Sequence, residues 1–237
     1  MAAKLEKFKI LIPNLFTALS LVSGLFALQF IFEDNFVFSA WLIAVSMLCD
    51  GLDGKLARLL NAQSKFGATF DTLSDFFAFG IVPGFLAYRS LLHQIHYLGI
   101  IISVFYVFAG GYRLVRFTLK NDDTIKKHTF IGLPIPAAAG MISSYIVFNF
   151  YLLEQTGSAE ILLLITFISS LLMISKIEYL PIEKRKKLSK EAKFFILLAV
   201  FSIIAALKFW YFVFLIWVLI YVLYGIIRSM VFTFKKR

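Results

Sequence analysis

The chain of 237 residues is 60% hydrophobic and 17% aromatic but only 16% charged, well below the roughly 25% charged residues of an average soluble domain. This composition excludes an ordinary soluble protein. One cysteine excludes a disulfide framework, and three histidines leave little for a zinc centre. The net charge of +10 comes from basic residues scattered between apolar runs, so it indicates membrane orientation rather than nucleic-acid binding.

Apolar runs long enough to cross a bilayer core about 30 Å thick recur along the whole chain. We predict eight helical spans, at residues 15–32, 36–56, 68–92, 97–119, 135–153, 160–175, 193–207 and 209–231. Residues 192–234 also fit one hairpin, or one span and a surface helix. The predicted fold is an all-α polytopic membrane bundle in one domain, 1–237. It has a six-helix catalytic core at 14–178, and a basic loop with two further spans at 179–237.

The chain ends and the short loops indicate how the bundle is oriented. Residues 1–13 are basic and amphipathic and show no cleavage site, so we predict a juxtamembrane helix on the membrane surface. Nearly all of the 24 lysines and arginines lie at the two ends or after the second, fourth and sixth spans. By the positive-inside rule these segments are cytoplasmic, in an integral cell (inner) membrane protein.

Four aspartates lie where the second span turns into the third. Asp50 and Asp53 are three residues apart and Asp71 and Asp75 are four apart, so two adjacent helices can aim all four carboxylates at one point. Acids in a span need neutralising partners. Oxygen ligands alone suit Mg²⁺ or Mn²⁺, with Ca²⁺ as an alternative bound ion, and two such ions can clamp a pyrophosphate. An ion-paired loop with nearby basic residues is the alternative.

Small residues surround these acids. Gly51, Gly54, Ala57 and Gly67 leave the helix surface bare, so a phosphate or a base can approach the backbone. Close helix packing explains each of them equally well when it is taken alone. Arg58 lies four residues after Gly54 on the same helix face, where a guanidinium can hold phosphate oxygens.

Residues 50–75 fit the pattern D-x-x-D-G-x-x-A-R-x8-G-x3-D-x3-D with every fixed position filled. This pattern resembles the signature of the CDP-alcohol phosphotransferases. The resemblance implies a homodimeric helical bundle that transfers a phosphatidyl or related group from a CDP-linked donor to a hydroxyl and releases CMP. It also implies that Asp50, Asp53 and Asp71 bind metal, and that Asp75 touches a metal and acts as the general base.

The same resemblance implies contacts with the CDP-linked lipid. Gly54, Arg58 and Ser64 match contact positions of the family, and P-N-L-F-T at 13–17 fits its early Asn and Thr. Asn14 and Thr17 share a helix face and can donate to pyrophosphate, although Asn14 fits a helix cap as well. The predicted CDP-lipid-binding residues are Asn14, Thr17, Gly54, Ala57, Arg58, Ser64 and Gly67.

Further stretches resemble the serine-accepting branch of this family. They are N-A-Q-S-K-F-G at 61–67 with D-T-L-S-D at 71–75, Y-R-L-V-R-F at 112–117, and F-I-G-L-P-I-P-A-A-A-G at 130–140. We predict that Arg113 and Arg116 bind the serine carboxylate or the lipid phosphate, with positive-inside anchoring as the alternative. Gly132 and Pro134, in the turn before the fifth span, are further candidates for serine contact, and so is His128.

The resulting hypothesis is a direct displacement, dependent on two Mg²⁺ or Mn²⁺ ions, in which L-serine attacks CDP-diacylglycerol. The expected partners are these two substrates, membrane lipid and a second copy of the chain, with no nucleic acid. Another acceptor, such as glycerol 3-phosphate or inositol phosphate, and an ether-lipid donor remain open. A cation transporter is the alternative from another class, but it predicts acids spread through several spans.

Overall fold

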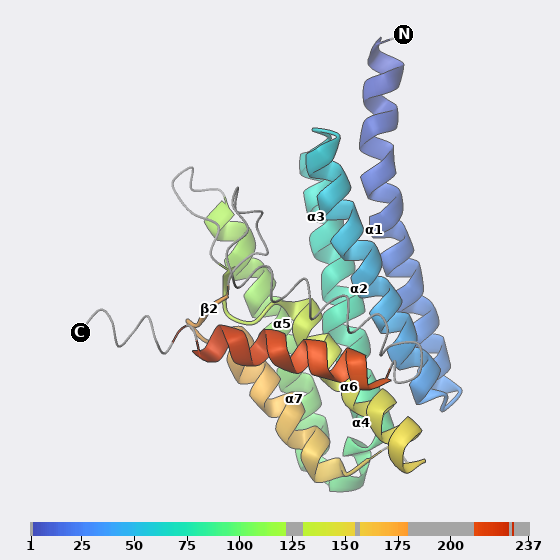
Figure 1. The fold of residues 1–237 in the computed structure, drawn as a ribbon, viewed down its shortest axis with the longest axis vertical. Helices are drawn as coiled ribbons and strands as arrows, with labels where there is room; N and C mark the ends of the chain where they lie inside the picture. The colour runs from blue at the N-terminus through green and yellow to red at the C-terminus, as the bar shows by residue number, and fades with distance from the viewer. Residues whose placement is uncertain (1, 122–129, 155–156, 180–210, 228, 230–237) are drawn as a thin grey trace, which may run out of the picture.

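The computed structural model describes residues 2–121, 130–154, 157–179, 211–227 and 229. This part of the chain is almost entirely helical, with α1, α2 and α3 running alongside one another and the later helices packed beyond them (Figure 1). The elements are α1 (Ala2–Phe32), α2 (Phe36–Leu59), α3 (Lys65–Asp75), η1 (Phe76–Ile81), α4 (Val82–Ser90), η2 (Leu92–Ile95), α5 (His96–Asn121), β1 (Phe130–Ile131), α6 (Ile135–Leu153), α7 (Ala159–Ile174), β2 (Glu178–Tyr179) and a helix at Tyr211–Ile227. The two short strands pair antiparallel.

Within the described part of the chain, five helical stretches are long and apolar enough to cross a membrane. They are Lys9–Phe32, Phe36–Leu59, Lys65–Ser90, Leu92–Leu119 and Ile135–Leu152. Each overlaps one of the first five predicted spans, which confirms a polytopic helical membrane protein. The sixth predicted span forms the shorter α7, and the eighth overlaps the shorter helix Tyr211–Ile227, which runs across α6 (Figure 1). The count of eight is therefore not confirmed, and residues 193–207 and most of the basic loop lie outside the described residues.

The N-terminal segment differs from the prediction. Instead of a separate surface helix at residues 1–13, α1 continues without a break from Ala2 through Pro13 to Phe32. Proline removes one backbone N–H, but ending the helix in an apolar environment leaves more backbone groups unpaired. Thr17, one turn later, donates a side-chain hydrogen bond to the Pro13 carbonyl at 3.2 Å. The helix therefore remains continuous through Pro13, and α1 packs against α2 and α3.

Hydroxyl groups hold α1 against α2. The side chains of Ser20 and Ser46 hydrogen-bond to each other at 2.7 Å, and Ser46 also donates to the Ser20 carbonyl at 2.9 Å. One turn along, Ser23 donates to the Leu42 carbonyl at 2.7 Å. Small polar side chains let two helix backbones approach and satisfy one another inside lipid, where apolar residues provide no net driving force between helices. This interface fixes the rotation of α2 about its axis, and therefore where its acids point.

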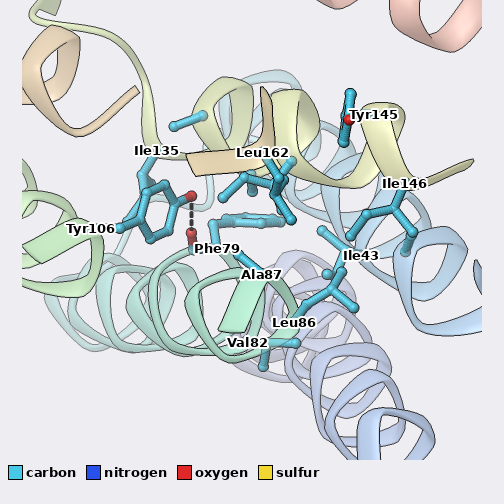
Figure 2. Packing of buried hydrophobic residues seen from close by; sticks show 14 of the residues in the cluster. Ile43, Phe79, Val82, Leu86, Ala87, Tyr106, Ile135, Tyr145, Ile146 and Leu162 are labelled. Carbon is cyan, nitrogen blue, oxygen red and sulfur yellow. Dashed lines mark hydrogen bonds between the residues drawn. The ribbon is translucent and has the colours of Figure 1, made fainter. Parts of the chain in front are cut away.

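The third span contains a turn that the sequence analysis did not predict. Between α3 and α4, the segment η1 is a π-helical turn, in which the Val82 amide donates to the Phe77 carbonyl five residues back. The fully buried Phe79 lies in this turn and is packed among side chains from α4, α5, α6 and α7 (Figure 2). The hydroxyl of Tyr106 on α5 donates to the Phe79 carbonyl at 2.9 Å.

Candidate active site

The carboxylates of Asp50, Asp53 and Asp71 converge. One oxygen atom from each lies within 4.8 Å of the others, so these three acids from α2 and α3 form a group that fits a metal ion. Asp53 is buried and the other two are half-buried. Within the described part of the chain, the buried Oδ1 of Asp71 has no hydrogen-bond partner. An unpaired buried carboxylate oxygen is costly, and three carboxylates this close, with only oxygen donors, suit Mg²⁺ or Mn²⁺.

Asp75 lies beside this group, at the end of α3. Its carboxyl group is close enough to that of Asp50 for a hydrogen bond, and two carboxyl groups in that position need a proton or a cation between them. The buried guanidinium of Arg113 on α5 interacts electrostatically with both Asp75 and Asp50. Its Cζ atom also lies 5.3 Å from the ring centroid of Phe117. The structure thus brings all four predicted acids and one of the two predicted arginines together.

Thr17 contacts the acids directly. Its buried hydroxyl donates to Oδ2 of Asp53 at 2.7 Å, and its backbone carbonyl accepts a hydrogen bond from Ser74 on α3 at 3.2 Å. In this arrangement Thr17 orients an acid, whereas its predicted role was to donate a hydrogen bond to pyrophosphate. α1 therefore supports both acidic helices at the site.

The glycines of α2 leave space beside the acids. Apart from the adjacent residues and the backbone of α2 itself, no described heavy atom lies within 4 Å of the position that a Cβ would take on Gly51 or Gly54. Arg58 is exposed, and its Nε donates to the Gly54 carbonyl at 2.9 Å, so its side chain folds back along α2 toward this bare stretch. Ala57 is half-buried, one turn after Asp53. These features form an open backbone surface next to the carboxylates.

Two other predicted lipid-binding residues, Asn14 and Ser64, meet at Gly67. A Cβ on Gly67 would lie 2.9 Å from Oδ1 of Asn14 and 3.0 Å from Oγ of Ser64. Ser64 caps α3, because its Oγ accepts a hydrogen bond from the Gly67 amide at 3.0 Å. Asn14 does not cap a helix, since α1 is already continuous there. Its amide group instead faces the start of α3.

Arg116 lies away from the acids, although it is only three residues from Arg113. Its guanidinium donates to four carbonyl oxygens, at distances from 2.5 to 3.2 Å. These belong to Ile131, Met173, Ile174 and Ser175. A planar guanidinium with several donors suits the unpaired carbonyl groups at the end of a helix, here α7. The guanidinium of Arg116 therefore has a structural role, because it holds the end of α7 and the Ile131 carbonyl together. The predicted role of Arg116 in binding serine or phosphate would need the same donor groups.

The turn before α6 uses its backbone groups in the same junction. Gly132 has a φ of +83°, and its amide donates to the Ile177 carbonyl at 2.8 Å. A Cβ here would clash with Arg116 Nη2 and the Met173 carbonyl. Pro134 comes directly before α6. Gly132 thus packs against the end of α7 and Pro134 marks the start of α6, while His128 lies outside the described residues.

The π-helical turn and its contact with Tyr106 were not predicted from the sequence. A signal was present in Pro83, because the carbonyl of Phe79 would pair with the amide of residue 83 in an α-helix, and proline has no amide hydrogen. The tyrosine itself has no local signal. Its place opposite Phe79 depends on how α5 packs against the third span.

Comparison with known proteins agrees with this geometry. A family model described as CDP-alcohol phosphatidyltransferase matches residues 10–177. The CDP-diacylglycerol--serine O-phosphatidyltransferase of Helicobacter pylori (strain ATCC 700392 / 26695) is 36% identical over 192 residues, which cover 81% of this chain and 79% of that protein.

Relatives with the same name occur in a second bacterium and in an archaeon. The protein of Bacillus subtilis (strain 168) is 32% identical over 71% of this chain and 89% of its own length. The protein of Methanocaldococcus jannaschii is 33% identical over 72% of this chain and 74% of its own length.

Proposed function

The chain belongs to the CDP-alcohol phosphatidyltransferase family, and we propose that it transfers the phosphatidyl group of CDP-diacylglycerol to the hydroxyl of L-serine, forming phosphatidylserine and CMP. The observation that carries the chemistry is the convergence of Asp50, Asp53 and Asp71 beside Asp75. The choice of serine follows the names of the relatives in two bacteria and an archaeon.

Asp50, Asp53, Asp71 and Asp75 would hold Mg²⁺ or Mn²⁺, and the bound cations would neutralise charge on the pyrophosphate and on departing CMP. The carboxylate of Asp75 takes the proton from the serine hydroxyl. The serine oxygen forms a bond to the phosphorus that carries diacylglycerol, and the bridging P–O bond to CMP breaks. The displacement is direct, because no serine, cysteine or histidine of the described site is paired with a base.

The remaining residues of the site position the donor. Gly51 and Gly54 leave room for the pyrophosphate against the backbone of α2. Arg58, which folds toward Gly54, can hold a phosphate oxygen. Thr17 keeps Asp53 oriented, and Arg113 compensates the charge of the acids. The acyl chains stay in the bilayer, so the donor enters sideways from the membrane.

The positive-inside distribution of lysine and arginine supports placing both termini and the active site on the cytoplasmic side of the cell membrane. The family resemblance supports a homodimer in which each single-domain chain carries its own site. The number of bound ions, for which we propose two, follows from the pyrophosphate chemistry.

Release of CMP by the purified full-length protein tests the proposal. CDP-diacylglycerol and Mn²⁺ or Mg²⁺ are supplied with L-serine, glycerol 3-phosphate, inositol phosphate or no acceptor. The Asp75→Asn variant should lose activity by about 10² to 10⁴, the usual contribution of a general base. Asp34→Asn is the matched control, since Asp34 is exposed and pairs with Arg89 rather than with the acids.

Release that needs both serine and Asp75 supports the reaction and its base. Release with another acceptor would replace serine and keep the catalytic residues. A burst of CMP without an acceptor, together with a trapped phosphatidyl-enzyme, would refute direct displacement.

A further inference from the structure

The π-helical turn η1 begins directly after Asp75. In this turn the amide of Val82 pairs with the carbonyl of Phe77, five residues back instead of four. Single π-helical turns inside α-helices are rare and occur frequently at functional sites. Here the turn separates the acidic helix α3 from α4, which lies in the apolar core.

Pro83 explains why the helix departs from α geometry here. In an α-helix, the Phe79 carbonyl would accept the amide hydrogen of residue 83, which proline lacks, and the proline ring would press against that carbonyl. The hydroxyl of Tyr106 donates a hydrogen bond to the same carbonyl oxygen, with 2.9 Å between the two oxygen atoms, and both residues are fully buried (Figure 2). The side chain of Tyr106 therefore satisfies the backbone group that Pro83 leaves without its usual partner.

One face of α5 follows this part of the third span. Tyr106, Gly110 and Arg113 are spaced four and three residues apart, so they share a helix face. Tyr106 contacts Phe79, and Arg113 interacts with Asp75. Between them, a Cβ on Gly110 would lie 3.8 Å from the Gly80 backbone and 2.7 Å from Cδ1 of Ile135. The same face of α5 thus packs along the whole turn and ends at Asp75.

The register of the turn decides where the acids point. One residue more or less in a helix rotates everything beyond it by about 100°. α4 is anchored by Val82, Leu86 and Ala87, each fully buried. If η1 became α-helical while α4 stayed in place, α3 would rotate and carry Asp75 away from its present neighbours.

We propose that Tyr106 is a positioning residue for Asp75: its hydroxyl holds η1 in the register that aims Asp75 at Asp50 and Arg113. The inference rests on the proposed function, in which Asp75 takes the proton from serine. Tyr106 is fully buried in the apolar core and does not touch the substrate. Its effect on catalysis passes through the backbone of the turn.

Three variants of the full-length protein test the inference. Tyr106→Phe removes only the hydroxyl. Pro83→Ala restores the amide that an α-helical register needs. Tyr145→Phe is the matched control, because the Tyr145 hydroxyl also bonds to backbone, at Ser158, but it joins α6 to the start of α7. For each variant we would measure kcat, both KM values, thermal unfolding, and amide hydrogen exchange of the segment 76–84.

Tyr106→Phe should lower kcat about tenfold to a hundredfold, as expected when a catalytic group is misplaced, while both KM values stay within about twofold of wild type. Exchange in the segment 76–84 should rise. Pro83→Ala should lower kcat without lowering the unfolding temperature, because the helix gains a hydrogen bond while Asp75 loses its direction. Tyr145→Phe should change the unfolding temperature but not kcat.

Wild-type kcat and unchanged exchange in Tyr106→Phe would overturn the inference. Equal losses of kcat in Tyr106→Phe and Tyr145→Phe would also overturn it, since they would indicate general destabilisation. A wild-type protein that releases no CMP with serine would refute the proposed function instead. In that case the amide hydrogen exchange of the segment 76–84 would still test whether Tyr106 stabilises the turn. Unchanged exchange in Tyr106→Phe would refute that stabilisation, and increased exchange would support it.

Discussion

Removing one hydroxyl group should weaken the metal site without removing any of its predicted ligands. Thr17 is 3% exposed and Asp53 is 5% exposed, and the hydroxyl of Thr17 donates to Oδ2 of Asp53 at 2.7 Å. Thr17→Val has nearly the same shape but no donor. The carboxylate of Asp53 then loses the hydrogen bond that fixes its orientation, in a place where water cannot easily replace it.

The size of the effect follows from the type of bond. A hydrogen bond to a charged group contributes about 1.5–3 kcal/mol, and loss of a partner that orients a metal ligand typically costs about 10-fold to 100-fold in metal affinity. The two magnitudes agree, because a tenfold change in metal affinity corresponds to about 1.4 kcal/mol of binding free energy. The Mn²⁺ concentration at half-maximal activity should therefore rise by about 10-fold to 100-fold, with kcat at saturating Mn²⁺ close to wild type.

A Mn²⁺ titration of CMP release measures this change. Thr17→Ser keeps the hydroxyl and should restore the wild-type dependence on Mn²⁺. Thr69→Val is the control, since Thr69 is exposed on α3 and donates only to the Lys65 carbonyl in its own helix, at 3.0 Å. An unchanged Mn²⁺ dependence in Thr17→Val would refute the reasoning, and so would a loss confined to kcat at saturating Mn²⁺.

Three further predictions concern the scaffold. Gly132→Ala should lower the free energy of unfolding by at least about 1–2 kcal/mol, because φ is +83° and a Cβ would clash with the Met173 carbonyl; an unchanged thermal unfolding curve would contradict this. Arg116→Lys keeps the charge but loses the planar donor group, so it should lower the unfolding temperature and leave the KM for serine unchanged, whereas a serine-binding arginine would raise that KM. Arg89→Ala breaks the exposed ion pair with Asp34. Chemical denaturation should therefore show that the free energy of unfolding falls by at most about 1 kcal/mol. A larger decrease would contradict the prediction that this exposed ion pair contributes little to stability.

Local patterns in the sequence predicted the features that depend on neighbouring residues along the chain. Hydropathy located the first five spans, since a helix that crosses lipid satisfies its own backbone groups. The spacing of Asp50, Asp53, Asp71 and Asp75 predicted that they would converge, because residues three or four apart share a helix face. The structure brings these four acids together, as that spacing predicted.

Local patterns failed where two elements meet. Arg113 and Arg116 share a face by the same spacing rule, yet one faces the acids and the other caps α7. The long side chain of an arginine can reach partners in several directions, so the neighbouring helices decide which groups its guanidinium contacts. Pro13 also misled the prediction, because a proline that ends a helix in water can be retained within one in a membrane.

The sequence by itself thus determined the class of fold, the order of its spans and the helix face that each pair of acids shares, because these features depend on hydropathy and on residues close in the chain. Only the tertiary structure decided that Thr17 holds Asp53, that Arg113 compensates Asp75, and that Tyr106 meets the carbonyl of Phe79. These contacts join residues on different helices. They depend on the rotation of each helix about its axis, which the packing of the whole bundle sets.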